Sequence, residues 1–219
     1  MIVIHILAGV ALFPQFWSWG AAATLFILYW VTACLGVTLG YHRLLSHRSF
    51  KVPQWLARFF ATCGALSAEY GPVTWVGLHR QHHKHSDKAL DPHNSKRGIW
   101  WSHIGWMFVR VPGEKRVRRY AGDMRKDPYF VWLDKYFLFL QIPLGLTLYL
   151  LGGWSYVLWG IFLRLVHIVR AYSIFKDKMK AIQVCVNRFD DETKQAFLEL
   201  YDKVDGDVDL DKLEDKSYD

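Results

Sequence analysis

The sequence predicts an all-α fold, an integral-membrane helical bundle in which two transmembrane hairpins flank a cytoplasmic region rich in histidine. Three observations predict it. The 219 residues are 52% hydrophobic and 16% aromatic, too apolar for a disordered chain. Charged residues are absent from positions 1–41 and 136–163, and the positions between these two stretches are strongly basic. The three cysteines form no CxxC pair, which argues against a disulfide scaffold.

The first predicted hairpin begins with a short apolar helix over 2–13 and a turn over 14–18 that contains Pro14. The segment Trp19–Leu39 then runs for 21 uncharged, mostly apolar residues. A helix of this length covers about 30 Å, the thickness of the bilayer hydrocarbon. No basic segment precedes the apolar residues, so a signal peptide is not expected here.

The second predicted hairpin lies in the uncharged stretch 136–163, which is long for one span. Gly152 and Gly153 interrupt it and predict a turn between two helices. The second of these helices continues past Arg164. An arginine inside a span is costly, so we expect its side chain to face protein or water.

The region between the hairpins, 42–135, holds 17 Lys or Arg against 7 Asp or Glu, a net charge of +10. The positive-inside rule therefore places it on the cytoplasmic side. Within it, the moderately apolar stretch 59–78 contains Glu69, Gly71 and Pro72. These residues predict a helix in the interface, or packed on the spans, rather than another crossing.

Two histidine clusters stand out in this region. One is HxxxxH, with His42 and His47, and the other is HxxHH, with His79, His82 and His83. On a helix the second cluster shares one face, because residues three and four apart are neighbours. The first cluster spans more than one turn, so it converges only where a helix is distorted or ends.

Imidazole nitrogen suits iron, zinc, copper or nickel. Five histidines exceed what one tetrahedral zinc takes from a protein, so a site shared by two metal ions is the better interpretation. The alternative is a basic stripe that lies on an anionic membrane surface. A nucleic-acid partner is not expected, because no groove-reading or aromatic module accompanies the basic residues.

The residues around both clusters point to a known family. The segments concerned are GYHRLLSHRSF (40–50), WVGLHRQHHKHSD (75–87), DPHN (91–94), RGIWWSHIGW (97–106), QIPLG (141–145) and GIFLRLV (160–166). Together they resemble the integral-membrane fatty acid desaturases of the Δ9 acyl-CoA/acyl-lipid group, most nearly the cyanobacterial acyl-lipid type.

The resemblance implies a di-iron enzyme that uses O2 to introduce a cis double bond into an acyl chain. Its partners would be a fatty acyl lipid or acyl-CoA, O2, the membrane, and an electron donor such as ferredoxin or cytochrome b5. The expected metal ligands are all five histidines: His42, His47, His79, His82 and His83.

The acyl chain of such a substrate needs an apolar, water-free tunnel. Trp75 and Trp101 are candidates to line it, and an interfacial aromatic belt is the alternative interpretation. Asn94, Lys96 and Arg97 are candidates to meet the head group, with a solvated loop as the alternative.

The third histidine box of the family has no match after Val166. We therefore expect a desaturase-like membrane domain over 1–175, incomplete at its C-terminal end and only in part able to hold two irons, and a divergent acidic tail over 176–219. Residues 185–219 carry 12 acidic against 5 basic side chains. Two alternatives to an active desaturase stay open at this point: a truncated or frame-shifted relative without catalysis, and a basic membrane-surface adaptor.

Overall fold

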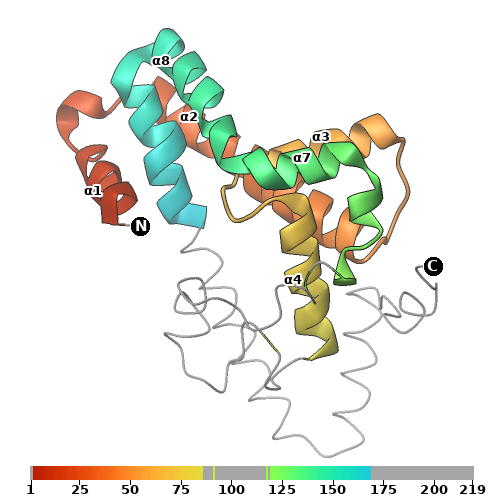
Figure 1. The fold of residues 1–219 in the computed structure, drawn as a ribbon. Helices are drawn as coiled ribbons and strands as arrows, with labels where there is room; N and C mark the ends of the chain where they lie inside the picture. The colour runs from red at the N-terminus through yellow and green to blue at the C-terminus, as the bar shows by residue number, and fades with distance from the viewer. Residues whose placement is uncertain (1, 86–90, 92–116, 118, 169–219) are drawn as a thin grey trace, which may run out of the picture.

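The computed structural model describes residues 2–85, 91, 117 and 119–168 (Figure 1). All regular elements among these residues are helical, which confirms the all-α fold class. In chain order they are α1 (Ile2–Val10), η1 (Pro14–Phe16), α2 (Trp19–Tyr29), η2 (Trp30–Ser46), α3 (Gln54–Ala65), α4 (Pro72–Lys84), η5 (Met124–Lys126), α7 (Pro128–Tyr136), η6 (Phe137–Leu140), α8 (Gln141–Val157) and η7 (Leu158–Leu163).

The first span follows the short helix α1 and the predicted turn at Pro14. The hydroxyl of Ser18 accepts a hydrogen bond from the Ala21 N–H at 3.0 Å and so caps α2. Helix α2 then continues directly into η2, which gives one helix, Trp19–Ser46, of 28 residues and mean hydropathy 1.9. It is long and apolar enough to cross a membrane, and it ends beyond the predicted Leu39, so that it carries His42.

The second candidate span, Pro128–Ile168, has 41 residues and reverses direction at the predicted glycines. Gly153 has a φ of 64°, a left-handed conformation that favours glycine, and α8 folds back on itself in Figure 1. Arg164 on the returning arm is fully buried. It donates to the carbonyl oxygens of Gly160 and Leu66, at 2.7 and 2.9 Å, and to Gln141 Oε1 at 3.2 Å. The expectation that Arg164 faces protein is confirmed.

The stretch 59–78 is not one helix, as the sequence suggested, but parts of α3 and α4. The chain leaves α3 after Ala65, passes Ala68 with a φ of 61°, and starts α4 at Pro72, a residue suited to a first helical turn. Asp134 of α7 accepts hydrogen bonds from the Thr74 N–H and hydroxyl, at 2.8 and 2.9 Å. A carboxylate at a helix N-terminus is stabilising, so α7 fixes where α4 starts.

Helix α3 packs closely along η2, in agreement with the prediction that this region lies on the spans. The contact is made at Gly36 and Gly40, a GxxxG pair on η2. A methyl group at Gly36 would lie 2.3 Å from the Gly64 nitrogen of α3, and one at Gly40 would lie 3.0 Å from the Phe60 Cβ. Small residues at such spacing let two helix backbones approach each other.

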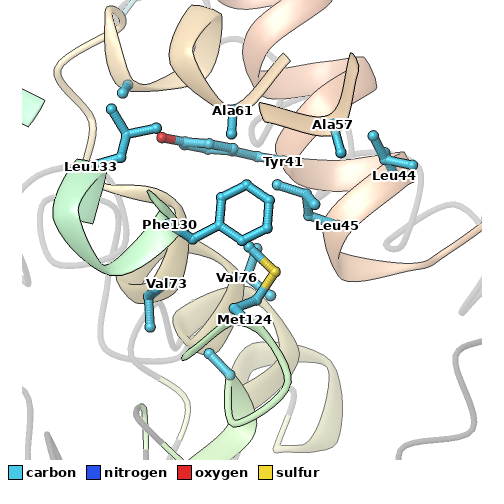
Figure 2. Packing of buried hydrophobic residues seen from close by; sticks show 12 residues of the cluster. Tyr41, Leu44, Leu45, Ala57, Ala61, Val73, Val76, Met124, Phe130 and Leu133 are labelled. Atoms are coloured by element: carbon cyan, nitrogen blue, oxygen red, sulfur yellow. The ribbon is translucent and has the colours of Figure 1, made fainter. Parts of the chain in front are cut away.

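A buried core joins η2, α3, α4, η5 and α7 (Figure 2). Its members include Tyr41, Leu45, Val76, Phe130 and Leu133. Tyr41 of this core immediately precedes His42, Leu45 lies two residues before His47, and Val76 lies one turn before the second histidine cluster. The core therefore holds the two helices that present the histidines in a fixed relation.

Candidate metal centre

Four histidines from the two clusters converge. His47 Nε2 lies 3.1 Å from His42 Nε2 and 3.0 Å from His79 Nε2, and His83 Nε2 lies 3.0 Å from His79 Nε2. One ligand nitrogen from each of the four lies within 4.8 Å of those of the others. Neutral imidazoles whose ring nitrogens face one another in this way can share one metal ion.

The first cluster converges because the end of η2 is π-helical. The His47 N–H donates to the His42 carbonyl at 3.0 Å, a bond between residues five apart, and the Ser46 hydroxyl donates to the Tyr41 carbonyl at 2.8 Å with the same spacing. A π-helical turn places residues i and i+5 near each other, and such turns occur often at functional sites. This is the distortion that the HxxxxH spacing requires.

His79 and His83 lie one turn apart on α4 and complete the group. The Trp75 ring stacks on the His79 ring with centroids 4.9 Å apart and an interplanar angle of 21°. Burial, and then the neighbouring imidazoles of His83, His42 and His47, hold the pKa of His79 well below its ordinary value. His79 is therefore neutral near pH 7, the state in which an imidazole offers a lone pair to a metal.

His82 lies outside the group of four. Its Nδ1 lies 2.8 Å from Oδ1 of Asp91, whose side chain is buried. A carboxylate that binds one ring nitrogen of a histidine fixes the tautomer and directs the other nitrogen toward a metal. The sequence grouped His82 with its neighbours by helical spacing, and the only earlier sign of Asp91 was its place in the DPHN segment.

Sequence reasoning missed the side chains that surround Trp75. Its Nε1–H donates to Glu69 Oε2 at 3.4 Å, and the Tyr41 ring lies 5.4 Å from the Trp75 ring. Burial raises the pKa of Glu69 to about 7, and the hydrogen bond from Trp75 lowers it in part. Trp75 is thus held between a carboxyl group and a histidine of the cluster.

The remaining predicted substrate residues, Asn94, Lys96, Arg97 and Trp101, lie outside the described residues. The same holds for the predicted acidic tail, 176–219.

The donor set fits the iron that the sequence resemblance implies. The four converging ligands are all imidazoles, which suit iron, zinc, copper and nickel rather than magnesium or calcium. One of them, His79, is neutral and partly buried beside an aromatic ring. Such a group could hold a transition-metal ion.

Comparisons with known proteins identify the family of the chain. The model of the fatty acid desaturase family matches residues 6–177. An sn-1 stearoyl-lipid 9-desaturase of Anabaena variabilis is 51% identical over 163 residues, which cover 74% of this chain and 60% of that protein.

Two further relatives show the same pattern. An sn-1 stearoyl-lipid 9-desaturase of Synechocystis is 48% identical and shares 75% of this chain and 52% of its own length. A chloroplastic palmitoyl-monogalactosyldiacylglycerol delta-7 desaturase of Arabidopsis thaliana is 38% identical, and the match covers 74% of this chain and 44% of that protein. The chain thus spans about half the length of the curated relatives it matches. With its histidines gathered as described and most of its residues matched by the family model, the chain belongs to the fatty acid desaturase family.

Proposed function

We propose that the protein is a fatty acid desaturase of lipid biosynthesis, which uses O2 and iron to introduce a cis double bond at the Δ9 position of an acyl chain. The observation that carries the proposal is the convergence of His42, His47, His79 and His83 on one point. The names of the relatives, stearoyl-lipid 9-desaturases at about half identity, support the reaction and its position. They favour it over an inactive relative and over a membrane-surface adaptor.

In this proposal the four converging histidines hold one iron, and His82, oriented by Asp91, serves a second. Iron held there would activate O2, the oxidant that cleavage of an unactivated C–H bond requires and that no amino-acid side chain can replace. The protein contributes the position of the ligands and the exclusion of water. The Trp75 ring, which stacks on His79, would shield this ligand from water on one side.

The substrate is an acyl chain carried by a lipid or by coenzyme A. Trp75, which covers His79, would line the apolar tunnel together with Trp101, and Asn94, Lys96 and Arg97 would meet the head group. Residues 1–175 would form the desaturase domain in the membrane. The net charge of +10 over 42–135 supports a cytoplasmic position for the histidines, where ferredoxin or cytochrome b5 supplies electrons.

Two measurements test the function. The purified full chain in detergent is analysed for iron, and the gene is expressed in a desaturase-deficient host whose fatty acids are then profiled. Iron together with restored Δ9 unsaturated acyl chains supports the proposal. Bound iron without new double bonds would assign the chain to the inactive relative, and no metal with retained binding to anionic vesicles would assign it to the adaptor.

Replacing Asp91 with Ala is expected to weaken the binding of the second iron, which His82 serves, and to leave the binding of the first unchanged. Outer partners of metal-bound histidines contribute about 10- to 100-fold in affinity, and Asp91 binds His82, which lies outside the group of four. Iron titration should show one site weakened by that factor and one unchanged. Asp91→Asn, which keeps an oxygen for the His82 ring N–H, should lose less iron affinity than Asp91→Ala. An equal loss at both sites would contradict the role given to His82.

A further inference from the structure

Each histidine cluster contains a histidine followed by an arginine whose side chain reaches the same carboxylate. Arg48 follows His47, and Arg80 follows His79. Both guanidinium groups bind Asp123, which lies in the segment between α4 and α7. Neither arginine has a side-chain nitrogen suited to a metal, so their role differs from that of the histidines beside them.

Arg80 points away from the metal ligands and into the protein, where it is 2% exposed. It binds Asp123 with two nitrogens, Nη1 to Oδ1 at 2.7 Å and Nη2 to Oδ2 at 3.2 Å. It also donates to the last carbonyls of η2, from Nη2 to Leu45 at 2.7 Å and from Nε to Ser46 at 3.3 Å. The side chain from the second cluster thus binds the backbone that immediately precedes His47.

Arg48 reaches Asp123 from the other cluster, with Nη2 2.6 Å from Oδ2. Its backbone φ of 51° is left-handed and marks the point where the chain turns out of η2. Burial raises the pKa of Asp123, but the hydrogen bonds and charges of Arg80 and Arg48 lower it further, to below its ordinary value. The carboxylate is therefore ionised near pH 7, and both arginines share its single negative charge.

We propose that Asp123 is a positioning residue that fixes His47 against His79 through Arg80 and Arg48, and that it thereby sets the affinity of the metal centre. The proposal rests on the metal site of the proposed function. Removing the carboxylate would leave Arg80 as a buried charge without its counter-ion. It would also deprive both arginines of the counter-ion that they share, beside a site that must accept a metal cation.

The test uses the full chain in detergent with Fe²⁺ under anaerobic conditions, and Co²⁺ as a spectroscopic probe. Asp123→Asn keeps the size and hydrogen-bonding oxygen of the side chain but removes its charge. We expect its affinity for both ions to fall at least tenfold, and the Co²⁺ absorption bands to shift as the ligand geometry changes. Asp123→Glu, which restores the charge, should recover most of the affinity.

Asp127→Asn is the matched control. Asp127 binds Arg58 at 3.1 Å and caps α7, so it is also an ion-paired carboxylate, but its partners lie outside the histidine clusters. The Asp127→Asn substitution should change metal affinity less than twofold, even if it lowers thermal stability. Equal metal affinity in the parent and in Asp123→Asn would overturn the proposal, as would equal losses in Asp123→Asn and Asp127→Asn.

Two additions keep the test decisive. If Asp123→Asn does not accumulate as folded protein, Arg48→Gln replaces it, and an unchanged metal affinity in that variant would also overturn the proposal. If the parent chain binds no metal, the proposed function fails on its own. In that case the proposal is tested by the rate at which diethyl pyrocarbonate modifies His47 and His79. Faster modification in Asp123→Asn supports the positioning role of Asp123, and an equal rate contradicts it.

Discussion

Replacing His79 with Ala is expected to abolish iron binding by the group of four and, with it, any desaturation. His79 joins the two clusters, since its Nε2 lies 3.0 Å from the Nε2 atoms of both His47 and His83. Loss of an outer partner of a metal ligand already costs about 10- to 100-fold in affinity, so loss of a ligand at the centre should cost at least about 100-fold. Metal content after gel filtration and fatty-acid profiles of the complemented host would measure both effects.

His5→Ala is the control for this experiment. His5 lies on α1, is exposed, and does not belong to the group of four. It should leave iron content and product unchanged. A His79→Ala chain that keeps its iron and still restores unsaturated acyl chains would rule out the assigned metal centre.

Replacing Gly36 with Ala is expected to destabilise the protein, although alanine is the better helix former by about 1 kcal/mol. The added methyl group would lie 2.3 Å from the Gly64 nitrogen and 2.4 Å from the Cys63 carbonyl carbon. These are backbone atoms, so α3 itself must move. Overpacking of this kind costs about 1–3 kcal/mol and is expected to outweigh the gain in helix propensity.

The displacement should reach the histidines, because α3 and η2 share the core that fixes His42. We therefore expect a lower unfolding temperature in detergent and weaker metal binding in the same variant. Gly9→Ala is the matched control, since a methyl group there meets nothing within 4 Å on the helix α1. It should be neutral or slightly stabilising, and equal destabilisation in the two variants would contradict the close contact.

Much of the fold could be predicted because it depends on local properties of the chain. Uncharged runs of sufficient length predicted the two candidate spans, Trp19–Ser46 and Pro128–Ile168. Gly152 and Gly153 predicted the reversal of direction within the second of them. The prediction of one helix over 59–78 was wrong. Hydrophobicity there is continuous, but backbone conformation changes at Ala68 and a new helix begins at Pro72.

The candidate site could be predicted only in part. The HxxHH spacing places His79 and His83 on one face of a helix, whereas the HxxxxH spacing brings His42 and His47 together only because η2 ends in a π-helical turn. His82 shares the helical period of His79 and His83 and yet faces Asp91, since hydrogen bonding to a buried carboxylate decides its orientation. No local sequence pattern marks Tyr41 or Glu69 as part of the site. The structure places them there because both contact Trp75, which stacks on His79.

The sequence by itself determined that the chain is helical, that two stretches suit a bilayer, and which histidines are candidate metal ligands. These properties follow from hydropathy, charge and helical period, which act over a few turns. Only the tertiary structure decided that η2 ends in a π-helical turn, that α3 lies against Gly36, and that Asp123 joins the two clusters. Those features bring together residues up to 75 positions apart, as in the pair Arg48 and Asp123, and their partners are selected by packing and charge rather than by any local sequence pattern.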